Sequence, residues 1–244
     1  SLHDALPISC ALRMKGNLQE ALKLFNNCKK IDPANPAISY ELGTIYKLLG
    51  VNDLALVNAK ACAEADQKNE WYQLLLIDCY NSQRLYNQAV KVRENLVKNF
   101  PEKVEFKEDL AIQYSIIGQY EKAFKIYDEL EKTYGINEQI TLNKVKLLKE
   151  QKKIKNMEAE LLRLLESNKS ETRYYSYLAD FYIENHELEK AKTMYDQILT
   201  IEPNNPTVNL ALHDYYSAQG KNKEAFYFLR KAFENPDLDV ATKY

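Results

Sequence analysis

The chain has 244 residues, of which 45% are apolar and 28% are charged, and its net charge is −2. This near balance excludes the strongly basic surface that is typical of nucleic-acid binding, and only six Gly and seven Pro argue against an all-β protein. No apolar stretch approaches the length of about 18 residues that a transmembrane helix requires.

The first residues, 1–8, read SLHDALPI, which can be back-translated into a common sequencing-adapter read. We therefore treat them as a non-native segment and leave them out of the functional argument. The cysteines Cys10, Cys28, Cys62 and Cys79 have no CxxC or metal-ligand spacing, so we expect buried free thiols.

Alanine recurs at steps of 34 residues, with one step skipped, at Ala21, Ala55, Ala89, Ala123, Ala191 and Ala225. A period of this length predicts stacked helix–turn–helix repeats. The pattern divides residues 2–239 into seven repeats, 2–35, 36–69, 70–103, 104–137, 138–171, 172–205 and 206–239. We expect the repeats to continue beyond both ends, with residues 240–244 as the start of a further one.

Each repeat carries signals for two helices. Gly43 and Ala55, in the second repeat, are expected where its two helices cross, because larger side chains would separate the backbones. Gly50 is expected to end the first helix in a left-handed turn. Asn35 then caps the next helix, and Pro36 occupies its first turn.

The fifth repeat, 138–171, is degenerate. Lys144 replaces a recurrent Leu, Met157 replaces the Ala, Lys152 replaces the Gly and Lys169 replaces a Pro. Its helical periodicity survives, so we expect a helix pair that packs more loosely than its neighbours.

These positions resemble the tetratricopeptide repeat (TPR) family, most clearly in the sixth repeat, through Tyr175, Leu178, Ala179, Tyr182, Ala191, Tyr195, Ile198 and Pro203. The resemblance covers nearly the whole chain. It implies an all-α fold, a right-handed α-solenoid of tandem helix–turn–helix repeats. The residue usage is similar to that of long bacterial TPR proteins of Bacteroidota, which slightly favours the cell envelope or periplasm over the cytoplasm.

Sequence motifs of enzymes are missing: there is no phosphate-binding loop, nucleophile elbow or zinc motif. His3 lies in the excluded segment, and packing explains His186 and His213 more simply than catalysis. The sequence therefore predicts no catalytic residue, no metal site, no cofactor and no enzyme.

The resemblance also implies a concave groove lined by the first helix of each repeat. The candidate partner-binding residues are Tyr40, Thr44, Lys47, Trp71, Asp78, Asn81, Glu105, Glu108, Ile112, Lys146, Arg173, Asp180 and Asp214. This mixture of aromatic, apolar and charged groups suits an extended peptide or a partner helix. The family members that clamp acidic C-terminal tails use Lys and Asn where the third repeat has Leu74 and Asp78, so such clamping is not expected.

Two structural interpretations compete with partner binding. Trp71 could pack against the second repeat instead of contacting a partner. The charged residues of the groove could serve only to increase solubility. The leading functional hypothesis is a protein-interaction scaffold with a protein or peptide partner and no nucleic acid. The alternative is a sensor or regulatory segment of a larger bacterial signalling protein.

Overall fold

The computed structural model describes residues 2–235, and from residue 7 onward it also describes the side chains. Residues 240–244, the expected start of a further repeat, lie outside this range. All regular secondary structure in the described residues is helical, and its elements are α1 (Leu2–Met14), α2 (Leu18–Ile31), α3 (Pro36–Leu48), α4 (Asn52–Ala65), α5 (Glu70–Ser82), α6 (Tyr86–Asn99), α7 (Val104–Ile116), α8 (Tyr120–Tyr134), α9 (Glu138–Glu150), α10 (Ile154–Ser167), α11 (Thr172–Glu184), α12 (Leu188–Ile201), α13 (Pro206–Ala218) and α14 (Asn222–Glu234).

The helices form hairpins that follow one another along the chain, which confirms the all-α solenoid class. From α3 to α13, every second helix begins 34 residues after the previous one, at Pro36, Glu70, Val104, Glu138, Thr172 and Pro206. The chain forms two compact parts, an N-terminal unit (Ser1–Glu129) and a C-terminal unit (Leu130–Tyr244). The division into seven repeats stays a prediction.

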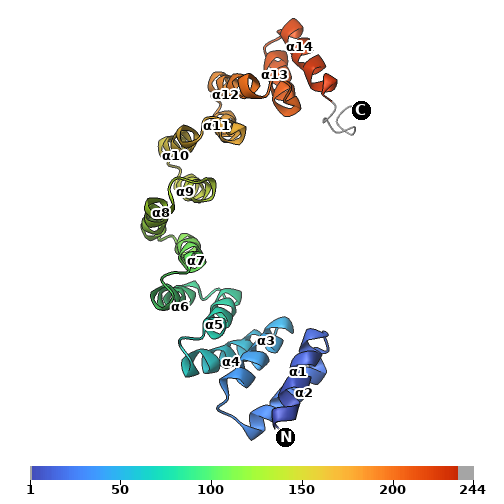
Figure 1. Cartoon of the computed structure of the whole chain (residues 1–244), viewed down its shortest axis with the longest axis vertical. Coiled ribbons are helices and arrows are strands. Elements are labelled where there is room, and N and C mark those ends of the chain that lie inside the picture. The colour runs from blue at the N-terminus through green and yellow to red at the C-terminus, as the bar shows by residue number, and fades with distance from the viewer. Residues whose placement is uncertain (1, 236–244) are drawn as a thin grey trace. The chain divides into compact units, whose positions relative to one another are not determined.

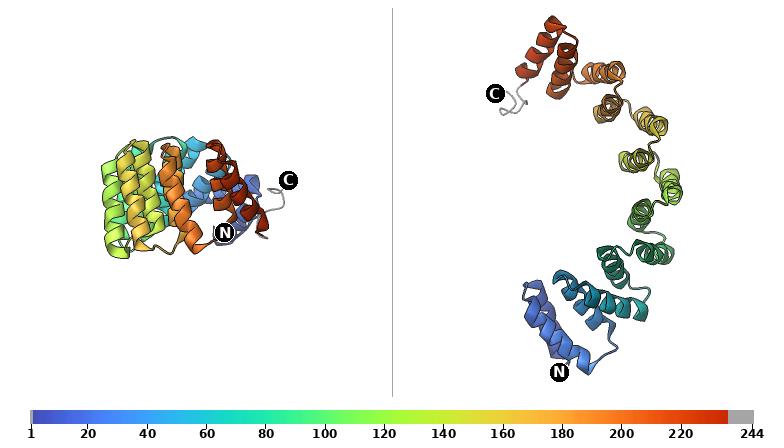
Figure 2. Two further views of the ribbon diagram at one scale, coloured as in Figure 1. Left: turned by 90° about the horizontal axis from the view of Figure 1, so that it is seen from above. Right: turned by 180° about the vertical axis from the view of Figure 1, so that it is seen from behind.

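Within each unit, first and second helices of the hairpins lie on opposite sides. In the N-terminal unit α5 and α7 lie on one side and α4 and α6 on the other, and in the C-terminal unit α9 and α11 lie opposite α10 and α12 (Figures 1 and 2). Each unit therefore presents one face made of first helices.

The two helices of a hairpin approach each other closely at the small residues. A Cβ atom on Gly43 of α3 would lie 3.3 Å from the backbone N of Ala59 and 3.4 Å from the carbonyl O of Ala55, both in α4. It would also lie 3.0 Å from Cδ2 of Leu75 in α5. One glycine thus permits close contact with the next helix and with the following hairpin.

At the turn between the two helices of each hairpin, one residue adopts the left-handed backbone conformation, whether or not it is glycine. Gly50 has φ 73°, and Arg84, Lys152 and His186 have φ 59°, 57° and 61°. His186 stands where glycine stands in other repeats and is exposed, so the packing role expected for it is wrong. His213 does pack: it is half-buried, and its Nδ1 lies 3.0 Å from the carbonyl O of Ala225.

Asparagine caps begin several first helices. The side chain of Asn35 accepts hydrogen bonds from the backbone N–H groups of Ala37 and Ile38, and the side chains of Asn69, Asn137 and Asn205 cap α5, α9 and α13 in the same manner. These oxygens satisfy N–H groups that have no partner within the helix.

The cysteines are free thiols, as expected: Cys28, Cys62 and Cys79 are buried and Cys10 is half-buried. Burial raises the pKa of the Cys62 thiol and of the Cys79 thiol to about 11. Both side chains pack in one apolar cluster with Ala55 and Ala59.

A charge network around the buried Lys144 links the degenerate fifth repeat to the end of the fourth. Lys144 of α9 is only 1% exposed, and its Nζ lies 2.8 Å from Oε2 of Glu131 in α8. Arg163 of α10 reaches the same oxygen at 3.1 Å. The hydrogen bonds and charges of Lys144 and Arg163 outweigh burial and hold the pKa of Glu131 below its usual value. The network joins α8, α9 and α10. Its central residue, Lys144, occupies a position at which the other repeats have an apolar side chain.

The close crossing of α3 and α4 gives a first prediction. Ala55→Leu should lower the free energy of unfolding by about 1–3 kcal/mol, because Ala55 is 1% exposed and extra methyl groups would force the helices apart. Ala61→Leu is the matched control, since Ala61 is exposed on the same helix. Urea denaturation of both variants measures the difference, and equal midpoints would show that α4 buries a different face.

The charge network gives a second prediction. Lys144→Leu should destabilise the chain by about 3 kcal/mol, although it restores the recurrent Leu, because it leaves the Glu131 carboxylate, whose side chain is only 11% exposed, with one cation fewer. The double variant Lys144→Leu with Glu131→Leu should recover most of the loss. A single variant that unfolds at the same or a higher urea concentration than wild type would contradict this reading.

Candidate functional site

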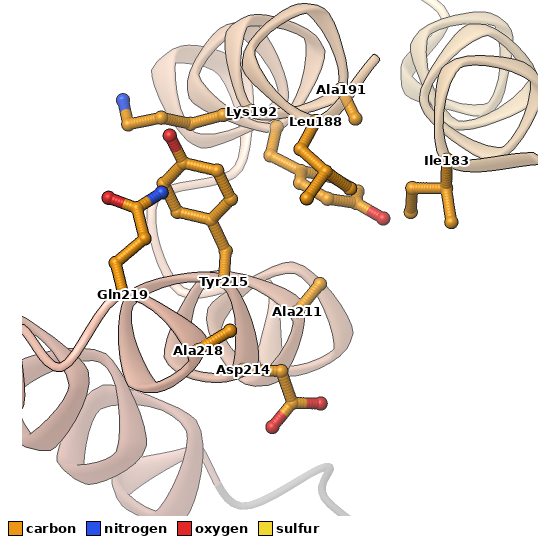
Figure 3. A pocket seen from close by; sticks show the side chains of 10 residues that line it. Ile183, Leu188, Ala191, Lys192, Ala211, Asp214, Tyr215, Ala218 and Gln219 are labelled. Carbon is orange, nitrogen blue, oxygen red and sulfur yellow. The ribbon is translucent and has the colours of Figure 1, made fainter. Parts of the chain in front are cut away.

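The C-terminal unit carries a hollow between α11, α12 and α13, which we call the large hollow. Its volume is about 420 Å³ and its lining is mostly apolar, consisting of Ile183, Leu188, Ala191, Lys192, Tyr195, Ala211, Asp214, Tyr215, Ala218 and Gln219. Figure 3 shows Ile183 on α11, Leu188, Ala191 and Lys192 on α12, and Ala211, Asp214, Tyr215 and Ala218 on α13, with Gln219 directly after the end of α13. The volume is within the range of about 300–1,000 Å³ that is typical of ligand pockets.

Three alanines explain why this space is open. One repeat earlier in the same unit, α9, α10 and α11 enclose a smaller hollow of about 140 Å³, which we call the small hollow. The residues that precede Ala191, Ala211 and Ala218 by 34 positions are Met157, Tyr177 and Glu184, and all three line the small hollow. Larger side chains at equivalent positions therefore fill most of the space that the alanines leave empty.

The polar side chains around the large hollow mostly have partners. Nζ of Lys192 lies 2.6 Å from Oδ2 of Asp196, and the hydroxyl of Tyr215 donates a hydrogen bond to Glu189. The hydrogen bond and charge of Asp196 raise the pKa of Lys192 above its usual value, so this cation is already neutralised by its own helix. Burial, and then the charge of Asp180, raise the pKa of the Tyr195 hydroxyl.

Asp214, one of the predicted residues, lines the large hollow. Its side chain is 84% exposed, and Figure 3 shows its carboxylate at the edge of the lining, away from Lys192. Nε2 of the neighbouring His213 lies 4.0 Å from Oδ1 of Asp214. Because a carbonyl oxygen can only accept, Nδ1 of His213 carries the proton that it shares with Ala225.

Asp180, another predicted residue, lines the small hollow. It is exposed, yet the environment of its carboxylate disfavours the negative charge. Partial burial, and then the nearby charge of Glu184, raise the pKa of Asp180 above its usual value. Glu184 itself pairs with Lys149 across α9 and α11 at 2.6 Å.

The predicted residues at the start of the N-terminal unit contact one another or their neighbours. Lys47 of α3 forms an ion pair with Asp78 of α5, and the ring of Tyr40 packs on that of Tyr72 with centroids 5.3 Å apart. The hydroxyl of Thr44 donates to the carbonyl O of Tyr40 at 2.9 Å. The Lys47–Asp78 ion pair and the Tyr40–Tyr72 contact connect α3 with α5, whereas the Thr44 hydrogen bond stays within α3. The pairing of Lys47 with Asp78 favours a structural role for these two charges.

The other predicted residues of the N-terminal unit are at least partly exposed to solvent. Trp71 is 61% exposed and Ile112 is 47% exposed, and Glu105 is exposed whereas Glu108 and Asn81 are half-buried. The ring of Tyr72, not that of Trp71, packs on Tyr40 between the second and third repeats.

The remaining predicted residues belong to the C-terminal unit. Lys146 is exposed. Arg173 contacts Glu138 at 3.4 Å and Glu171 at 3.0 Å.

The sequence analysis did not identify most of the wall of the large hollow. Leu188, Ala211, Tyr215, Ala218 and Gln219 lie outside the positions it assigned to the groove. One signal was available, because Ala211 and Ala218 are seven residues apart and thus share a face of α13. The candidate residues fall in both units, and a single groove lined by all of them stays a prediction.

Within residues 2–235, no helix is both long and apolar enough to cross a membrane. No group of three or more His, Cys, Asp or Glu side chains in the described part of the chain is placed to hold a metal ion.

Comparison with solved structures places this fold among tetratricopeptide repeat proteins. The chain is similar to a tetratricopeptide repeat protein from Parabacteroides merdae, with 18% identity, a TM-score of 0.61 and coverage of 99% of this chain and 96% of the other. It is also similar to the C-terminal part of a TPR repeat-containing protein from Cytophaga hutchinsonii, with 12% identity, a TM-score of 0.65 and 97% coverage of each chain.

A third similar structure is the complex of Naa15/Naa10 bound to HypK-THB, with 19% identity and a TM-score of 0.60, where the match covers 86% of this chain and 36% of the other. No protein-family model matches the sequence, and no curated protein matches it either. The chain thus has the TPR fold, and the resemblance seen in its sequence is confirmed at the level of the fold.

The exposure of Trp71 gives a third prediction, which separates the two interpretations of this residue. Trp71 is the one tryptophan of the chain, so its fluorescence is specific. Acrylamide should quench the native protein nearly as efficiently as the urea-unfolded chain, because most of the indole is in contact with water. Strong protection in the native state would instead indicate packing across the joint.

Proposed function

We propose that this chain is a protein-interaction module that binds an extended peptide or a partner helix on the faces made by its first helices. The observation that carries the proposal is the large hollow, an open apolar space between two successive hairpins. Apolar walls supply the free energy of binding when they are removed from water, and a few polar groups at the rim fix the orientation of the bound segment.

The exposed side chains of the first helices support the same role. In the N-terminal unit, Trp71 is 61% exposed and Ile112 is 47% exposed. In the C-terminal unit, Ile183 is 41% exposed. Aromatic side chains are enriched among the residues that dominate protein interfaces. We infer that these three residues, with Asp180 and Asp214, contact the partner, whereas Lys47, Asp78 and Arg173 mainly hold neighbouring helices together.

The comparisons support a binding role through the fold. The structure of Naa15/Naa10 bound to HypK-THB is an assembly of several proteins and matches 86% of this chain. By analogy we propose a scaffold that does not itself catalyse a reaction. A sensor or regulatory segment of a larger signalling protein would use the same surface, and the identity of the partner would distinguish it from a scaffold.

Affinity capture with matched variants tests the proposal and is our fourth prediction. Ala218→Leu places a larger side chain in the large hollow, and because Ala218 is exposed the variant should fold normally. Ser217→Leu is the control, since Ser217 is also exposed but does not line the hollow. From a bacterial lysate, Ala218→Leu should lose partner proteins that wild type and Ser217→Leu retain. The same set of captured proteins for all three would overturn the proposal.

A further inference from the structure

Two carboxylates of the C-terminal unit have no compensating lysine or arginine. Asp180 and Asp214 are 34 residues apart, so they occupy equivalent positions, one at the small hollow and one at the large hollow. No ion pair of either with Lys or Arg is recorded among residues 7–235. The other charged groups that line the two hollows are paired, Lys149 with Glu184 and Lys192 with Asp196, each at 2.6 Å.

The surroundings of Asp180 increase the negative character of this face. Glu184 lies close enough for its charge to raise the pKa of Asp180, although it is itself paired with Lys149. A cation that arrives with a partner would relieve this repulsion, whereas a second anion would add to it. This arrangement favours a cationic group of a partner over an anionic one.

We propose that the large hollow binds a partner segment in which a large apolar side chain stands next to a lysine or arginine. The apolar side chain enters the space left by Ala191, Ala211 and Ala218, and its cationic neighbour pairs with Asp214 at the rim. A second cation of the same segment pairs with Asp180. This inference deepens the proposed function and rests on it, because it specifies the chemistry of the segment that the face selects.

The geometry separates the two contributions to binding. The apolar wall is formed by α11, α12 and α13 together, while the Asp214 carboxylate lies at the edge of the lining. Affinity should therefore come mainly from the buried apolar side chain, and charge selectivity from Asp214. Because Asp214 is 84% exposed, its contribution should be that of a surface ion pair, which is modest and sensitive to salt.

The fifth prediction uses short fluorescein-labelled peptides in a Gly–Ser background, with a central Phe–Lys, Phe–Gln, Phe–Glu or Gly–Lys pair. Fluorescence anisotropy with the full chain should rank their affinities as Phe–Lys above Phe–Gln above Phe–Glu, and Gly–Lys should bind weakest. Added salt should weaken the binding of Phe–Lys and leave that of Phe–Gln nearly unchanged.

Two substitutions assign these effects to residues. Asp214→Asn should weaken binding of the Phe–Lys peptide by about three- to fivefold and leave that of Phe–Gln unchanged. Glu224→Gln is its control, because Glu224 is an exposed acid of α14 that does not line the hollow. Ala218→Leu should weaken the binding of both peptides, whereas Ser217→Leu should weaken neither.

The outcomes distinguish this inference from the proposed function. Equal affinities for Phe–Lys and Phe–Glu peptides, both lost in Ala218→Leu, would overturn the charge selectivity and leave the hollow as a peptide site. Binding of Phe–Lys that Ala218→Leu does not weaken would overturn the inference by placing the peptide elsewhere. Failure of every peptide to bind would also overturn it, even if captured proteins still depended on Ala218.

Discussion

The close approach of two helices within each hairpin is the constraint on which this structure depends. At Gly43, an added Cβ would come within 3.4 Å of backbone atoms of α4 and within 3.0 Å of Leu75. The buried alanines Ala55, Ala123 and Ala191 recur at the same phase of the sequence. When these residues are small, the larger apolar side chains around them can interlock at normal packing density. The small residues therefore recur every 34 residues because each hairpin brings the backbones of its two helices close together at the same position.

The first-helix faces serve both to connect hairpins and to present side chains to solvent. Lys47 with Asp78, and Lys149 with Glu184, join first helices of adjacent hairpins within a unit. Surface ion pairs contribute little to stability, about 0–1 kcal/mol each, but they neutralise charges that a partner would otherwise meet. Under the proposed function, the charges that remain uncompensated at the two hollows, those of Asp180 and Asp214, are the ones that would discriminate among partners.

The fifth repeat shows that the same backbone arrangement can be kept with different chemistry. Lys144 is buried where other repeats have leucine, and it is accommodated because Glu131 and Arg163 come from the two neighbouring helices. Desolvation of buried charges offsets much of their attraction, so the network replaces the apolar side chain of other repeats without a large gain in stability. Arg84, Lys152 and His186 similarly adopt the left-handed turn that glycine adopts more readily elsewhere.

The sequence by itself determined the helical class, the helix-starting asparagines and the small residues of the helix crossings, because each of these depends on neighbours close in the chain or on the 34-residue period. It also indicated Asp180 and Asp214 as candidates, through their phase in the repeat. Only the tertiary structure decided that Ala191, Ala211 and Ala218 face one common space, that Lys47 is neutralised by Asp78 and that the buried Lys144 pairs with Glu131. The physical reason is that a hollow or an ion pair is defined by side chains from different helices, and their meeting depends on how successive hairpins pack.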